Sequence, residues 1–169
     1  MLLGIDELRQ LVRDIKLVEG LLESEFRHSV GTGFDLRVGE LHAIAGKSYV
    51  GKDGRVMPET KLLASHFEGV GHHAIGEKEY YLIKTIEKLN LPDDVMAVFY
   101  PRSTFHRAGI HIITGLADPG YRGELTFGIS NMSAHDFILQ MGSRIVHALF
   151  FRVSGARPYQ GKWQGGRMA

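Results

Sequence analysis

The spacing of apolar and polar positions changes near residue 20. Over the first fifteen residues the apolar side chains recur at helical spacing, at Ile5, Leu8, Leu11, Val12 and Ile15. Asp6 stands near the start of this series, and aspartate is a common helix N-cap. The pattern predicts one amphipathic helix within about residues 1–20, ending near Gly20.

Beyond Gly20 the apolar positions fall into short runs separated by closely spaced glycines. The runs are FDLRVG, YYLIKTI, VMAVFYP, GIHIIT, ELTFGIS and RIVHALFF. Such β-prone runs are typical of an all-β sandwich or barrel. Asp53-Gly54 favours a two-residue turn, so KSYVGKDGRV predicts a hairpin. Residues 63–79 have no clear period and are interpreted as a loop.

Composition favours one domain and excludes several kinds of partner. The chain has 169 residues, 44% of them hydrophobic, which suits a single domain over residues 1–169. Its 20 basic and 19 acidic residues are spread along the sequence and give a formal charge of +1. Because no basic block occurs, a polymeric nucleic acid is not expected as a partner.

The absence of cysteine excludes disulfides, thiolate metal sites and a cysteine nucleophile. No signal peptide is recognised at the start, and no run approaches the roughly 18 apolar residues of a membrane span. We therefore expect a cytoplasmic protein without a membrane partner. Residues 155–169 form a glycine-rich, basic tail, for which a frayed, flexible terminus is the simplest interpretation.

The segment FYPRSTFHRAG groups candidate ligands for a phosphate chain. Arg102 and Arg107 offer planar forks of donors, and Ser103 and Thr104 offer hydroxyls. A solvated basic turn is an equally good interpretation of these residues by themselves. The nine histidines include no His-x-x-x-His pair, so we expect no metal held by protein ligands.

The segment GLADPGYRGELTFGISN presents an acid and a misplaced glycine. Asp118 precedes Pro119 and is thus biased towards an extended conformation before a bend. A local Asx-turn explains that acid without any function. Gly128 interrupts a strand pattern, which often signals a bulge or the close approach of another group.

Together these pieces resemble the superfamily of trimeric dUTP pyrophosphatases and dCTP deaminases. Five segments match its motifs in order: GTGFDLRVG (31–39), PRSTFHRAGI (101–110), GLADPGYRGEL (115–125), GSRIVHALFF (142–151) and the tail YQGKWQGG (159–166). The fourth has His147 where glutamine is usual, and the tail is more like that of the deaminase branch. The resemblance is greatest to archaeal-type dUTP pyrophosphatases of the dCTP deaminase family.

This resemblance implies a fold and a site. The fold would be a distorted β-barrel or jelly roll with a short N-terminal helix, assembled as a homotrimer with active sites at subunit boundaries. Asp118 would orient the attacking water on dUTP, and Mg²⁺ would be bound through the triphosphate. The implied substrate-binding residues are Arg102, Ser103, Thr104, Arg107, Ile113, Thr114, Gly115, Tyr121, His147, Tyr159, Lys162, Trp163 and Gln164. The tail residues would close over a neighbour's nucleotide.

The same resemblance separates the two branches at Gly128. Deaminases of this superfamily use a glutamate seven residues after the aromatic of the Pro-Gly turn, and seven residues after Tyr121 comes Gly128. Glu124 is about 13 Å along the strand, beyond reach of proton transfer. We therefore expect a dUTP pyrophosphatase. The alternatives are a dCTP deaminase, or bifunctional enzyme, with an unrecognised acid, and a non-catalytic nucleotide-binding regulator.

Overall fold

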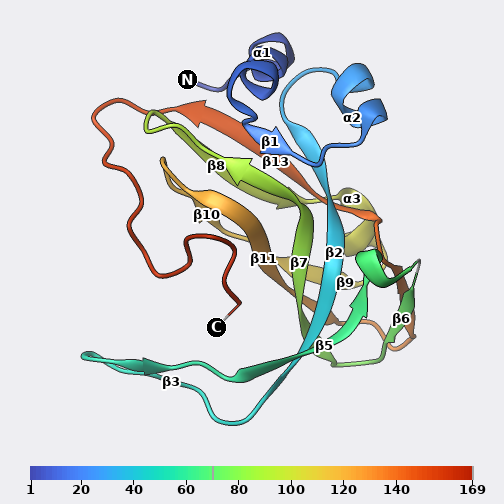
Figure 1. Cartoon of the computed structure of the whole chain (residues 1–169). Helices are drawn as coiled ribbons and strands as arrows, with labels where there is room; N and C mark the ends of the chain where they lie inside the picture. The colour runs from blue at the N-terminus through green and yellow to red at the C-terminus, as the bar shows by residue number, and fades with distance from the viewer. Residues whose placement is uncertain (70, 169) are drawn as a thin grey trace.

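The computed structural model describes residues 1–69 and 71–168, and strands make up most of it (Figure 1). Its helical segments are α1 (Ile5–Ile15), α2 (Glu23–His28), the 3-10 turn η1 (His66–Glu68) and α3 (Ser103–Arg107). Its strands are β1 (Val18–Glu19), β2 (Phe34–Ala45), β3 (Tyr49–Val50), β4 (Arg55–Val56), β5 (Glu59–Ser65), β6 (His72–Ile75), β7 (Tyr80–Asn90), β8 (Val95–Pro101), β9 (Ile110–Ile113), β10 (Leu116–Ala117), β11 (Arg122–Asn131), β12 (Phe137–Gln140) and β13 (Arg144–Arg152). The prediction of an all-β fold with a short N-terminal helix is confirmed.

One large antiparallel sheet curls into a half-barrel (Figure 1). Its strand order is β10-β8-β13-β2-β7-β11-β9, with β1 added on β7 and β5 added on β2. Strand β13, late in the chain, therefore lies between β8 and β2. The pairs β12-β6 and β3-β4 form two small separate sheets.

The N-terminal helix forms where its apolar spacing predicts, but its cap differs. Gly4 is the N-cap, and Asp6 lies inside the first turn. An acid there still favours the helix, because it faces the positive end of the helix dipole. Leu8 is fully buried, and the backbone N–H of Leu3 donates to the carbonyl of Phe150 at 2.9 Å. The start of the chain is thus fixed to its last strand.

The interpretation of residues 63–79 as a loop is wrong over most of the described part. Strand β5 continues to Ser65, η1 follows, and β6 pairs with β12. The partner strand lies more than sixty residues away, at 137–140, so local periodicity carried no signal for it. Helix α3 likewise replaces the turn expected after Pro101.

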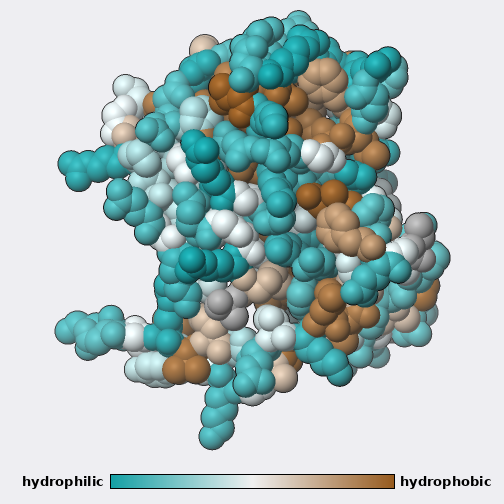
Figure 2. Space-filling view, in the orientation of Figure 1, coloured by the Kyte–Doolittle hydropathy of each residue, from teal (hydrophilic) through white to brown (hydrophobic). Residues whose placement is uncertain are grey.

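The hairpin at residues 47–56 is confirmed, although its connection is longer than predicted. Tyr49 pairs with Val56 and Val50 with Arg55, so the four residues 51–54 connect the strands. The N–H of Gly51 donates to the carbonyl of Gly54 at 2.8 Å and closes this loop. The hairpin extends away from the body as an arm at the lower left (Figures 1 and 2).

The core lies inside the curl of the sheet and under α1. Its fully buried members include Phe34, Leu36, Ile83, Ile129 and Phe150. A buried ion pair joins β2 to β7, since the Glu87 carboxylate accepts from Arg37 N and Nε at 2.7 Å each. Burial raises the pKa of Glu87, and the hydrogen bonds from Arg37 oppose that rise. No described helix is long and apolar enough to cross a bilayer.

Candidate active site

A cavity of about 430 Å³ opens beside the turn that joins β10 to β11. Its volume is in the usual range for small-molecule sites. Five residues predicted from the sequence line it together: Gly115, Asp118, Tyr121, Tyr159 and Trp163. They come from two segments about forty residues apart, so this grouping is produced by the fold.

Asp118 stands at the edge of this cavity with its side chain exposed. Its backbone carbonyl, not its carboxylate, closes the turn by accepting from Tyr121 N at 3.1 Å. Gly120 supplies the bend at φ 79°. Within residues 1–69 and 71–168, no hydrogen bond or ion pair engages the Asp118 carboxylate. The Asx-turn explanation is therefore not supported, and the acid remains available for a ligand.

Tyr121 forms a rigid wall of the cavity. Its ring is 8% exposed and lies edge-on to Tyr159, with the ring centroids 5.9 Å apart. Its hydroxyl donates to the backbone carbonyl of Glu124. Burial raises the pKa of Tyr121 to about 12, with a smaller contribution from the negative charge of Glu124. The phenol is thus neutral at physiological pH and offers an apolar face.

The tail lies along β10 and β11 of its own chain (Figure 1). Tyr159 N donates to the carbonyl of Pro119 at 2.7 Å, and Gly165 N donates to that of Arg122 at 2.8 Å. The Gln164 side chain accepts from Arg122 N at 2.8 Å and donates to the carbonyl of Gly120 at 3.0 Å. In the single chain the tail therefore lies beside the cavity of its own subunit, and its expected position over a neighbour stays a prediction.

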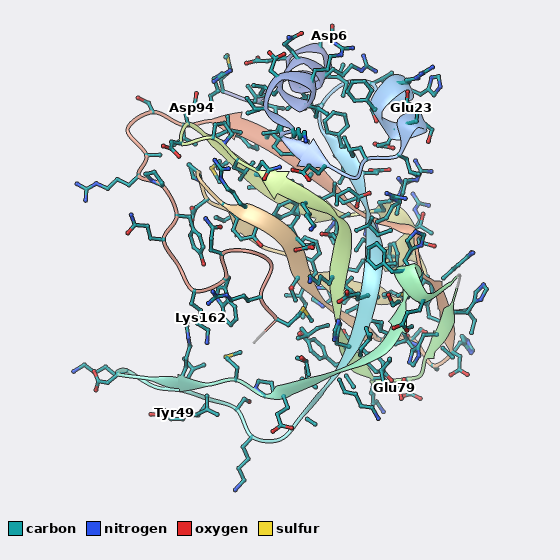
Figure 3. All side chains as sticks on the ribbon, viewed as in Figure 1. Asp6, Glu23, Tyr49, Glu79, Asp94 and Lys162 are labelled. Carbon is teal, nitrogen blue, oxygen red and sulfur yellow. The ribbon has the colours of Figure 1, made fainter. Side chains whose placement is uncertain are left out.

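Two cations flank the indole of Trp163. Lys162 Nζ lies 4.6 Å from a ring centroid of Trp163, and the Arg55 guanidinium carbon lies 5.3 Å from it. Because Arg55 belongs to β4, the hairpin and the tail meet over this indole. Figure 3 shows Lys162 above the hairpin that carries Tyr49. Positive charge thus gathers near the cavity from both segments.

Arg102 and His147 lie in a different charged cluster, built around Asp35. Arg102 forms an ion pair with Asp35, and His147 Nδ1 lies 2.8 Å from the same carboxylate. His147 Nε2 lies 2.6 Å from the carbonyl of Thr32. Both imidazole nitrogens thus face acceptors. Burial lowers the pKa of Arg102, and the nearby charge of Arg144 acts in the same direction.

This cluster borders a second hollow of about 540 Å³, whose lining includes Glu25, Asp35, Arg144 and His147. The two hollows have no lining residue in common among the residues described here. The single chain therefore does not bring Arg102 to the cavity of Asp118.

The remaining predicted ligands surround these two regions. Ser103, Thr104 and Arg107 are exposed on α3, directly after Arg102. Ile113 is 47% exposed at the end of β9, and the Thr114 hydroxyl donates to the carbonyl of Phe99 at 2.7 Å. Thr114 thus acts on the backbone, holding the segment before Gly115 against β8.

Gly128 is covered by a side chain that the sequence did not reveal. A Cβ atom at this position would lie 2.5 Å from the Tyr80 hydroxyl oxygen. Glu124, the one acid on strand β11, is held by Lys88 at 3.2 Å and by Lys84 at 4.0 Å. A side chain at residue 128 would therefore require the Tyr80 ring, which is 39% exposed, to move aside.

Sequence reasoning missed several residues that line the cavity. They include Met57 directly after the hairpin, Leu82 from β7, Phe99 from β8, Thr126 from β11, and Arg167 and Met168 from the tail. Only the tail residues gave a signal in the sequence, namely the basic composition of the tail. The others reach the cavity through long-range pairings.

Among the described residues, no group of three or more His, Cys, Asp or Glu side chains is placed to hold a metal ion. Asp118 and the cations near Trp163 fit a different arrangement, in which a divalent ion is carried by the phosphates of a nucleotide.

Solved structures share this fold at low sequence identity. The dCTP deaminase of Agrobacterium tumefaciens aligns with a TM-score of 0.66 and 20% identity over 88% of this chain. The alignment covers 47% of that deaminase, so this chain spans about half its length. A mutant dUTPase of phage phi11 of S. aureus aligns with a TM-score of 0.52 and 16% identity, covering 86% of this chain and 95% of the phage protein.

Curated relatives are closer in sequence. The dCTP deaminase of Pyrococcus abyssi is 36% identical over 80% of this chain and 79% of its own length. A probable deoxyuridine 5'-triphosphate nucleotidohydrolase of Methanothermobacter thermautotrophicus is 29% identical over 78% of this chain and 85% of its own. The model of the dCTP deaminase-like family matches residues 2–153. With the fold and the motif order in agreement, the chain belongs to the dCTP deaminase-like family of nucleotide enzymes.

Proposed function

We propose that this chain is a dUTP pyrophosphatase, which hydrolyses dUTP to dUMP and pyrophosphate. The observation that supports it most directly is which acids the chain offers at the positions where the two reactions need one. Asp118 offers an exposed, unengaged carboxylate at the edge, whereas Gly128 offers none at the position where a deaminating glutamate is expected.

In this proposal, Asp118 acts on a water molecule beside the α-phosphorus. Its exposed carboxylate accepts a hydrogen bond from the water and takes its proton during attack. A bond forms between the water oxygen and the α-phosphorus, and the bond to the bridging oxygen breaks as pyrophosphate leaves. Tyr121 would pack against the deoxyribose.

The phosphates would carry Mg²⁺, which supplies neutralisation of charge on the transferring group. Lys162, Trp163 and Gln164 approach from the tail, and Arg55 adds a cation from the hairpin. Most of the acceleration would come from positioning and charge neutralisation rather than from the strength of Asp118 as a base.

A homotrimer with shared sites follows from the same proposal. Asp118 and Tyr121 line one hollow, whereas Arg102 and His147 belong to another cluster. A second copy that presents its Arg102, Ser103 and Thr104 to the first copy's cavity would complete a triphosphate site. Cyclic, head-to-tail assembly repeats such a contact and closes it.

The second candidate function is deamination of dCTP. It is favoured by the names of the curated relatives, many of which are dCTP deaminases. Against it stands Glu124, the nearest acid on the strand, which is paired with two lysines and packs against Gly166.

One assay separates the candidates. Purified protein with Mg²⁺ receives dUTP, dCTP, dTTP or UTP, and pyrophosphate and ammonia are measured separately. We expect pyrophosphate from dUTP and no ammonia from any substrate. Ammonia from dCTP would overturn the proposal in favour of the deaminase, and neither product from any substrate would favour a nucleotide-binding regulator.

A further inference from the structure

The ring of Tyr80 lies on Gly128 across two paired strands. In the β7–β11 register, Tyr80 is opposite Ser130 and Leu82 is opposite Gly128. A Cβ at residue 128 would nevertheless lie 2.5 Å from the Tyr80 Oη and 3.0 Å from two of its ring carbons. The Tyr80 ring therefore lies diagonally across the two strands, over the residue two positions from its direct partner Ser130. Aromatic side chains can cover this distance.

This contact is at one end of the candidate active-site cavity. Thr126 and Gly128 are two residues apart on β11, so they are on the same face of the sheet. Thr126 and Leu82 line the cavity, but Gly128 does not. Tyr80 does not line the cavity either, so its ring over Gly128 lies next to the end of the cavity floor.

Beyond Tyr80 is another hollow, of about 310 Å³, beneath the hairpin. Tyr80, Tyr49 and Val56 line it, and Met57 and Leu82 line both this hollow and the cavity. Tyr80 is therefore placed at the boundary between the two spaces. Gly128 is also the cross-strand partner of Ile113. Under the proposed function, and on the family resemblance, we assign the uracil of dUTP to a slot formed by residues 110–115.

We propose that Tyr80 is a specificity-determining residue, whose ring closes the nucleobase end of the cavity over Gly128 and limits the size of the pyrimidine that enters. This inference rests on the proposed function, because it identifies the nucleobase end from the segment at Ile113. Burial raises the pKa of Tyr80, so the wall is a neutral phenol at physiological pH. It is therefore too weak a base to activate water there.

The test compares Tyr80→Ala and Tyr80→Phe, with Tyr49→Ala as the matched control. Tyr49 lines the same outer hollow but is not among the atoms nearest to Gly128. We expect Tyr80→Ala to raise the ratio of kcat/KM for dTTP to that for dUTP by about tenfold, the usual worth of one methyl group in a fitted pocket. Tyr80→Phe and Tyr49→Ala should leave that ratio within about twofold.

A double-mutant cycle tests the contact itself. Gly128→Ala places a methyl group against the Tyr80 ring and should raise the KM for dUTP, but it should have little effect in the Tyr80→Ala background. Additive effects in the two backgrounds would overturn the inference. Thermal unfolding accompanies each variant, and Tyr80→Leu replaces Tyr80→Ala if the latter does not fold.

Binding of α,β-imido-dUTP and α,β-imido-dTTP, measured by calorimetry, distinguishes a failure of this inference from a failure of the proposed function. If the wild type releases no pyrophosphate, the proposed function fails, and the ratio of the two affinities still reports on Tyr80. A Tyr80→Ala variant with a lowered Tm but an unchanged ratio would show that Tyr80 only covers a strand glycine.

Discussion

The acidic residues near the candidate site differ in whether other side chains already form ion pairs with them. Asp35 is paired with Arg102 and His147, and Glu124 is paired with Lys88. Asp118 has no such partner among the residues described in the structure. An acid left unengaged beside a cavity is available to bind a ligand, whereas the paired acids have structural roles already.

Asp118→Asn keeps the shape and hydrogen-bonding capacity of the side chain but removes its basicity. We expect pyrophosphate release from dUTP to fall by about a hundredfold or more, the usual contribution of a positioned base. Affinity for α,β-imido-dUTP should be almost unchanged. Full turnover by this variant would remove Asp118 from the mechanism.

Arg102→Ala should weaken nucleotide binding or turnover by about two orders of magnitude, as expected for the loss of a charge-assisted contact. Because Arg102 also pairs with Asp35, the Tm of the Arg102→Ala variant should be measured together with its kinetics. Arg107→Ala is the control, since Arg107 is exposed on α3 and should matter less. If neither Arg102→Ala nor Arg107→Ala changed kcat/KM, the phosphate site would have to lie elsewhere.

At the scale of elements, the tail is held by its backbone and by glycines. Gly123 adopts φ 135°, and a Cβ there would lie 2.5 Å from Gly166 N. Only glycine permits so close an approach of two backbones at that angle. The tail thus reaches the cavity through a small number of fixed contacts.

Removal of the tail after Pro158 should leave the fold intact and abolish most turnover. The segment has little apolar content for the core, but its Trp163 lines the cavity, between Lys162 and Gln164 in the sequence. Circular dichroism and pyrophosphate release measure the two effects separately. If the truncated protein kept both its activity and its circular dichroism spectrum, the tail would be a frayed terminus without a role in turnover.

The sequence predicted elements well where their signal was local. The helical spacing from Ile5 to Ile15 and the turn residues Asp53-Gly54 were sufficient for α1 and the hairpin. Strand β6 was missed because its partner, β12, is distant in sequence. Tyr80 was missed for a similar reason: its contact with Gly128 depends on the register of β7 against β11, which no local pattern determines.

At the scale of the whole molecule, the predicted ligands form two separate groups. The motif order indicated one site, but Asp118 lines one hollow, and Arg102 pairs with Asp35, which lines the other. A single sequence contains no information on which groups meet across a subunit boundary. The shared-site trimer is therefore the assembly to test.

Mixing two inactive variants tests the shared-site trimer. If each site takes Asp118 from one subunit and Arg102 from its neighbour, randomly assembled trimers of Asp118→Asn and Arg102→Ala should regain about a quarter of wild-type activity. Light scattering gives the mass of the assembly. No recovery after refolding the mixture, or a fully active monomer at micromolar concentration, would contradict shared sites.

The position of β13 has a consequence for how the chain folds as it leaves the ribosome. This strand is made last, yet it separates β8 from β2 in the sheet, and Arg144 pairs with Arg37 across more than a hundred residues. Until it emerges, both neighbours expose unpaired edges, which are prone to aggregation. The sheet should therefore be completed only after β13 has been made, and its folding should be slow, on the order of milliseconds to seconds. A chain ended at Gly142 should be insoluble on expression, whereas a chain ended at Pro158 should be soluble.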